Sequence, residues 1–208
     1  YPYTSFSDGY LTEEMLDSFL KELKEKELLS DNVLFKFTGG SCFLYDDLYK
    51  LFNVIKKYTK NVNLRFHADL MYPENVYQNV LQLFDKLNND MDICSVKMYI
   101  TTDYGSDTRY AKHINITSQD IIRRAEEIVS LFGCYQKFQI ELKTNINFYT
   151  DEKILISSFE KMVDKNCWLV YNPVRHKQYS PSVNQLQNII NLLDNIFETK
   201  IVYKREKI

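Results

Sequence analysis

The sequence predicts an α/β fold, a parallel-stranded partial (βα)6-type barrel built as a single domain. Helical and strand patterns alternate along all 208 residues with little between them. Strict alternation is typical of a parallel sheet with crossover helices. No linker or low-complexity tract divides the chain, so we expect one domain over residues 1–208. Right-handed crossovers leave a doubly wound sheet or a barrel, whole or partial.

A helix comes first, and no strand pattern precedes it. Thr12 is placed as its N-cap, with two glutamates directly after it. Helical spacing predicts an apolar face made of Met15, Phe19, Leu20 and Leu23. Because a βα architecture normally opens on a strand, we expect that the first strand lies upstream of Tyr1 or has been lost.

Five βα units and a last strand follow this helix. The predicted strands cover residues 33–37, 62–70, 92–101, 138–145, 167–172 and 200–204. The predicted helices cover residues 46–58, 74–87, 117–133, 151–164 and 181–197. The helix boundaries rest on a cap at Thr117 or Ser118, on Gly133 as a stop and on Pro73 as a first-turn residue.

Composition sets the class of protein. Lys and Arg number 26 against 28 Asp and Glu, a net charge of -2, which argues against a dedicated nucleic-acid-binding protein. No run of 18 apolar residues and no signal-peptide pattern occurs, so no membrane partner is expected. The four cysteines have no CxxC spacing and stand beside apolar runs, which predicts buried, reduced thiols and a cytoplasmic location. No metal site is predicted within this chain.

The candidate ligand site is the edge where the strands end. In parallel α/β folds, ligands bind at the carboxyl ends of the strands. The polar residues placed there are Thr38, Gly39, Gly40, Ser41, His67, Asp69, Lys143, Asn145, Arg175 and His176.

Each of these motifs has a functional and a purely structural interpretation. Gly39-Gly40 lets a backbone approach a ligand closely, or makes a tight strand-to-helix turn. His67 and Asp69 are two residues apart at a strand end, where they would serve as an acid–base or metal pair, or as a histidine satisfied by its neighbour. Arg175-His176 suits a carboxylate or phosphate, or is a solvated basic loop.

The segment "VLFKFTGGSCFLYDDLYKLFNVIKKY" resembles the second strand and helix of the radical S-adenosylmethionine superfamily, in which a Gly-Gly-Glu-Pro-type loop joins strand and helix. The order of later units, such as "LRFHADLMYPENVYQNVLQLFDKL", agrees with that layout. As motif, the resemblance covers residues 37–41. It implies that Thr38, Gly39, Gly40 and Ser41 bind S-adenosylmethionine and that His67, Asp69, Lys143, Asn145, Arg175 and His176 orient a substrate.

Two features depart from the superfamily. The cluster loop CxxxCxxC would precede Leu11, where "YPYTSFSDGY" has no cysteine, and Ser41 stands in place of the family's glutamate. A [4Fe–4S] cluster is therefore expected only if its ligands lie outside this chain. The chain is then a radical-SAM-like enzyme whose cluster motif lies upstream of Tyr1, or a pseudoenzyme that binds a small molecule. The alternative is a catalytically inactive barrel that serves as a binding or partner-interaction module. A third hypothesis is a different barrel enzyme that uses His67 and Asp69 as an acid–base pair.

Overall fold

The computed structural model describes residues 11–38, 42–45, 48–102, 116–162, 165, 167–174 and 179–197. The strands are β1 (Asn32–Phe37), β2 (Asn61–Ala68), β3 (Ile93–Thr102), β4 (Phe138–Ile146) and β5 (Cys167–Pro173). The helices are α1 (Glu13–Glu25), α2 (Leu48–Lys56), α3 (Glu74–Asn89), α4 (Ser118–Phe132), α5 (Glu152–Met162) and α6 (Val183–Phe197), with a 3-10 turn η1 (Cys42–Leu44). The predicted strand at 200–204 and the loops at 39–41 and 175–178 lie outside the described residues.

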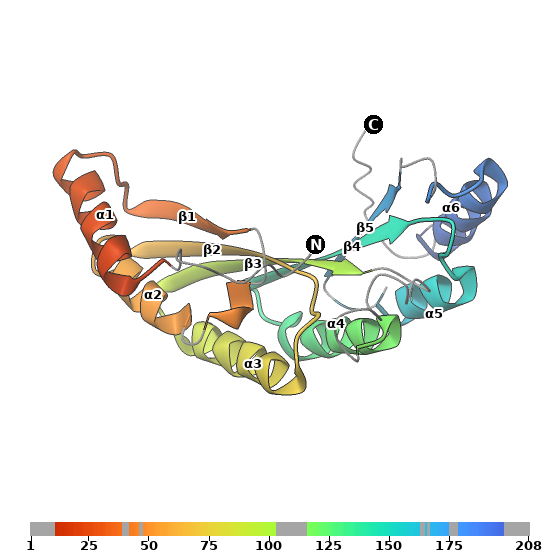
Figure 1. Ribbon diagram of the computed structural model, residues 1–208, viewed down its shortest axis with the longest axis horizontal. Helices are drawn as coiled ribbons and strands as arrows, with labels where there is room; N and C mark the ends of the chain where they lie inside the picture. The colour runs from red at the N-terminus through yellow and green to blue at the C-terminus, as the bar shows by residue number, and fades with distance from the viewer. Residues whose placement is uncertain are drawn as a thin grey trace.

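The five strands form one fully parallel sheet in the order β1-β2-β3-β4-β5. Every crossover therefore moves one strand further in the same direction, and α2 to α5 lie on one side of the sheet (Figure 1). A doubly wound sheet would reverse direction and place helices on both faces. This topology confirms the predicted parallel α/β class and is that of a partial barrel.

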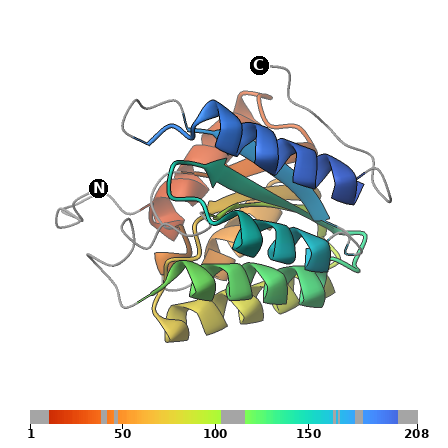
Figure 2. The ribbon, with the colours of Figure 1, turned by 90° about the vertical axis from the view of Figure 1, so that its right-hand side faces the viewer.

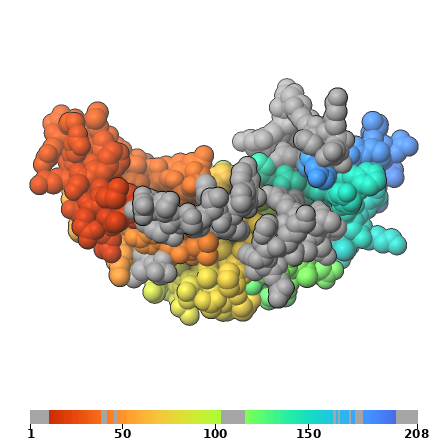
Figure 3. Space-filling model, in the orientation of Figure 1, coloured from red at the N-terminus to blue at the C-terminus, as the bar shows by residue number. Residues whose placement is uncertain are grey.

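The molecule has the outline of a crescent. Figure 1 shows the curved sheet with α2, α3, α4 and α5 along its convex side and α1 and α6 at the two ends. Turned by 90°, the view in Figure 2 shows α3, α4 and α5 running side by side. The space-filling view in Figure 3 is hollowed between the two ends of the crescent. The sheet thus has a helix-covered convex face and a concave face that none of α2 to α5 covers.

The hydrophobic core lies between the sheet and its helices. Its main cluster includes Phe52 of α2, Phe66 of β2 and Phe84 of α3, each fully buried. A smaller cluster joins α5 and α6, where Leu155, Phe159, Ile189 and Leu193 are fully buried. Aliphatic and aromatic side chains at helical spacing on the helices and at every second position on the strands meet in this layer.

Local signals placed the helix starts correctly. Thr12 caps α1 and accepts a hydrogen bond from the Met15 amide at 3.2 Å. Thr117 caps α4 in a reciprocal capping box with Asp120. Pro73 occupies the N-cap of α3 rather than its first turn.

Two predictions about burial are wrong. Met15 and Phe19 are 58% and 56% exposed, because α1 packs chiefly on α2 at the end of the crescent and buries only the strip with Leu16 and Leu20. Of the four free cysteines, Cys94 and Cys134 are exposed and only Cys167 is buried. Cys94 stands at a register shift between β2 and β3, and Cys134 follows the last turn of α4, so neither reaches the core.

Candidate functional site

The candidate site is the concave face of the sheet. Along β2, Val62, Leu64 and Phe66 are fully buried under the helices, whereas Arg65 and His67, at the alternate positions, are half-buried. Successive side chains of a strand point to opposite faces. The exposed positions of β1, and the half-buried and exposed positions that alternate with buried ones in β2 to β4, therefore line the concave face.

Each of the first four strands places one cation on this face. Lys36 of β1 lies opposite Arg65 of β2, which lies opposite Lys97 of β3. Lys143 belongs to β4, opposite Thr101 of β3. Glu141 is the one carboxylate that β1 to β4 contribute at these positions. The face is therefore strongly positive, although the chain as a whole is slightly negative.

A row of aromatic and polar side chains crosses the face beside the cations. His67, Tyr99, Glu141 and Trp168 are consecutive partners across β2, β3, β4 and β5. The rings of His67 and Tyr99 stack with their centroids 4.7 Å apart. Arg65 Cζ and Lys97 Nζ lie 5.6 Å and 5.2 Å from the centroid of the Tyr99 ring, so both cations contact one aromatic surface.

The electrostatic field on this face acts on His67. Burial lowers the pKa of His67 below its ordinary value near 6.5, and the positive charges of Lys36, Arg65 and Lys143 lower it further. His67 is consequently neutral at pH 7. Its Nε2 atom and the Nε atom of Arg65 are buried without a hydrogen-bond partner among the described residues.

The four cations also form no ion pair with a carboxylate among the described residues. The ion pairs that join described residues involve helix and loop lysines and arginines, and none includes Lys36, Arg65, Lys97 or Lys143. This face can therefore supply charge-assisted hydrogen bonds to an anion. Its neutral histidine can accept one hydrogen bond and donate another.

The structure brings some of the predicted site residues together. His67, Lys143 and Asn145 occupy concave-face positions of β2 and β4, and Thr38 follows β1 directly and is exposed. Five predicted residues lie outside the described residues: Gly39, Gly40, Ser41, Arg175 and His176. Their roles stay predictions.

Asp69 forms a local hydrogen bond in the loop that follows β2. Its Oδ1 atom accepts a hydrogen bond from the Met71 amide at 3.2 Å. Burial, with a smaller contribution from the Asp69 charge, raises the pKa of the Cys42 thiol to about 12. Within the described part of the chain no hydrogen bond joins Asp69 to His67. An acid–base pair of these two residues remains a prediction without geometric support.

Sequence reasoning missed Lys36, Arg65, Lys97, Tyr99 and Trp168. Most of these residues stand in the middle of strands, whereas the predicted site residues lie at or after the carboxyl ends of strands. The sequence did contain a signal for these residues. A strand that is buried on both faces has a continuous run of apolar residues, so a charged residue within the run indicates that one face is not buried. The segments "LFKF", "LRFHA", "VKMYI" and "IELKT" instead carry a cation within the alternation, which predicts one polar face.

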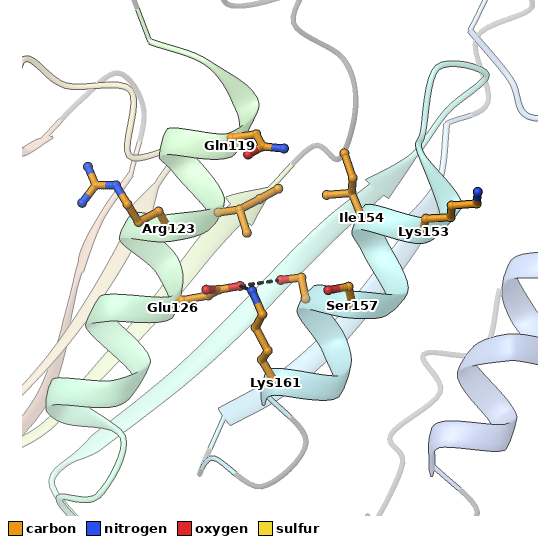
Figure 4. A pocket seen from close by; sticks show the side chains of 9 residues that line it. Gln119, Arg123, Glu126, Lys153, Ile154, Ser157 and Lys161 are labelled. Carbon is orange, nitrogen blue, oxygen red and sulfur yellow. Dashed lines mark hydrogen bonds and ion pairs between the residues drawn. The ribbon is translucent and has the colours of Figure 1, made fainter.

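A separate groove lies on the convex side between α4 and α5. Its volume is about 520 Å³. In the close-up of Figure 4, Lys161 reaches from α5 toward Glu126 of α4, and their charged atoms lie 3.7 Å apart. Ser158 also donates to Glu126, at 3.3 Å. None of the predicted site residues lines this groove, and its acidic side chain is already bound by its neighbours.

The described residues do not fit an iron–sulfur cluster. Cys42 follows the carboxyl end of β1, whereas Cys94, Cys134 and Cys167 stand at or near the amino ends of strands. Within the described ranges, no three His, Cys, Asp or Glu side chains come together as a metal site. Three converging thiolates are what such a cluster requires.

Comparisons with known proteins give one distant structural similarity. No family model matches the chain, and no curated protein matches its sequence. A domain of pyruvate-formate lyase-activating enzyme from Bacteroides vulgatus ATCC 8482 is similar in structure, with a TM-score of 0.49 and 14% identity over 78% of this chain and 93% of that chain. At this level the similarity identifies neither a family nor an activity. In the described part of the chain, no helix has the length and apolar character needed to cross a membrane.

Proposed function

We propose that the chain is a radical-SAM-like domain that binds S-adenosylmethionine or a related small molecule on the concave face, toward the carboxyl ends of the strands. One observation supports this proposal above all. Arg65, Lys97 and His67 gather around Tyr99, and Arg65 Nε and His67 Nε2 are buried without a partner among the described residues. Buried polar atoms are normally hydrogen-bonded, so these two atoms suit a ligand that completes them.

S-adenosylmethionine fits this face in part. Its carboxylate suits the guanidinium of Arg65 and the ammonium of Lys97. Its sulfonium and ammonium groups are positive, whereas the concave positions of the first four strands hold four cations and one carboxylate, Glu141. A related molecule with more negative charge would fit better.

No catalytic step is assigned to this chain. Reductive cleavage of S-adenosylmethionine needs a [4Fe–4S] cluster to supply an electron, and the described cysteines do not fit one. The role of the chain under this proposal is to hold and orient the ligand. His67, neutral at pH 7, would hydrogen-bond it through Nε2.

Trp168 provides the test, because it is the only tryptophan of the chain and shares a row with His67 and Tyr99. Titration with S-adenosylmethionine should change its fluorescence and reach saturation. The change should be lost in His67→Ala and kept in Lys153→Gln, a charge change on the convex face. A signal that rises linearly to millimolar ligand, or that is equally lost in both variants, contradicts binding at this face.

The alternative, an inactive barrel that recruits a partner, is favoured by a different observation. Met15 and Phe19 of α1 are 58% and 56% exposed and are spaced by four residues, so they form an apolar strip on that helix. Leu11, which precedes the helix, is 43% exposed. Under this alternative, Phe19→Ser should abolish the function of the protein in cells, while Arg65→Gln leaves it intact. The small-molecule proposal expects the reverse result for both variants.

A further inference from the structure

We infer that the ligand of the concave face is a compact, multiply charged anion of the phosphate-ester class, held over Lys36, Arg65, Lys97 and Lys143. This inference rests on the proposed function, since it names the chemical class of the ligand at the same site. It is carried by the distribution of charge, by the register of the strands and by the finding that no ion pair among the described residues includes the four cations.

Charge is sharply segregated in this molecule. The concave positions of β1 to β4 hold four cations and one carboxylate. The rest of the chain therefore has 22 basic and 27 acidic residues. Such segregation has an electrostatic cost, because like charges on one surface repel each other. An anion bound on the concave face would reduce the repulsion between these four cations.

The register sets the dimensions of the charged surface. Lys36, Arg65 and Lys97 stand side by side on three adjacent strands, which are about 4.8 Å apart. Lys97 lies opposite Gln139 of β4. Lys143 is four residues beyond Gln139 on the same strand, which separates the backbone positions of these two residues by roughly 13 Å. Cations thus flank the His67–Tyr99 row on two sides. An anion with two or more charged groups can reach several of them at once.

The four cations favour a ligand with several negative charges over a ligand with one. Arg65 and Lys97 lie over the ring of Tyr99 and have no ion pair among the described residues. A single carboxylate would neutralise one of the four. A phosphate ester brings up to two charges and three acceptor oxygens per group, which suits a guanidinium fork beside ammonium groups.

A small anion is favoured over a nucleic acid strand for two reasons. The four cations belong to neighbouring strands of one face, β1 to β4. The remainder of the chain is net negative, so it would repel a long polyanion that extends beyond this face.

The test is a titration of the full chain with inorganic pyrophosphate at constant ionic strength, followed by Trp168 fluorescence. Saturation is expected below about 1 mM. Arg65→Gln and Lys143→Gln should each weaken binding about tenfold, because each removes one charge-assisted contact. Lys143 is exposed, so its variant serves even if the Arg65 variant fails to fold. Lys153→Gln, the matched change on the convex face, should bind as the unmodified protein does.

The outcomes separate this inference from the proposed function. Saturation by S-adenosylmethionine but not by pyrophosphate overturns the ligand class and leaves the proposed function standing. Failure of both molecules to saturate overturns both. Saturation by pyrophosphate alone supports the anion class and removes S-adenosylmethionine. Equal weakening in Lys153→Gln, or tighter binding of a single-stranded oligonucleotide, overturns the inference.

Discussion

Arg124 of α4 donates a hydrogen bond from Nη1 to the carbonyl oxygen of Leu70, at 2.9 Å, and so fastens the loop that follows β2. The same nitrogen donates to Tyr72 O at 2.6 Å, and Nη2 donates to Glu74 at 2.7 Å. Leu70 adopts a left-handed φ of 56°, which a branched side chain disfavours. We call these three hydrogen bonds of Arg124 the clamp. The clamp holds the unfavourable backbone of Leu70 in place, next to Asp69 at the carboxyl edge of the sheet.

Removal of the clamp should destabilise the protein strongly. Arg124 is 3% exposed, so Arg124→Met leaves the carbonyls of Leu70 and Tyr72 buried without a donor. We expect the free energy of unfolding to fall by about 3–5 kcal/mol in urea denaturation. Arg123→Met is the control, because Arg123 is 56% exposed and forms surface ion pairs worth about 1 kcal/mol or less. Similar losses in the two variants would contradict the clamp.

Glu27 occupies a position that favours glycine. It follows the C-cap Lys26 of α1 with a φ of 57°. Its amide donates to Lys24 O at 3.0 Å and the Leu28 amide donates to Leu23 O at 2.8 Å, the pattern of a Schellman motif. Glu27→Gly should therefore raise the free energy of unfolding by about 1 kcal/mol. Glu25→Gly, at the last residue of α1, should instead lower it, by up to about 1 kcal/mol. A loss of stability in both variants would show that φ is not the controlling factor at residue 27.

The elements of this fold could be predicted because their signals are local. Thr12 and Thr117 mark helix starts within three residues of the amides that they cap. The strands were recognised from short apolar runs, and their alternation with helices implied the parallel sheet. These features depend on neighbours in sequence, so a single sequence contains them.

The site and the clamp depend on contacts between distant residues. Arg124 and Leu70 are 54 residues apart, and nothing near either of them identifies the other. The cluster of Arg65, Lys97 and Tyr99 depends on the register between β2 and β3, and a shift by one residue would point these side chains to the other face. Strand sequences alone do not fix that register. The rule that ligands bind at strand ends therefore predicts His67 and Lys143 as site residues but not Lys36, Arg65 or Lys97.

His67 should make stability depend on pH in a defined direction. Its pKa is lowered in the folded protein, by burial first and then by Lys36, Arg65 and Lys143, so the unfolded chain takes up a proton more readily. The free energy of unfolding should then fall as pH drops below about 6.5, the unfolded value, and stay constant with respect to His67 above it. The free energy of unfolding can be measured by urea denaturation at several pH values between about 7.5 and 5. In His67→Gln the part of this fall that is due to His67 should be absent. If the free energy of unfolding depends on pH in the same way in His67→Gln and in the unmodified protein, the prediction is wrong.

Lys143 should act on His67 through its charge alone. Lys143 is exposed on β4 and is one of the three cations that lower the pKa of His67, so Lys143→Gln should raise that pKa. Proton NMR of the imidazole ring follows the titration, and the signal that disappears in His67→Gln identifies it among the three histidines. Lys153→Gln should leave this pKa unchanged, because Lys153 lies on the convex face. An unchanged pKa in Lys143→Gln would mean that the cations of β2 and β4 do not share one surface. The concave face would then lack the concentration of charge on which an anion site depends.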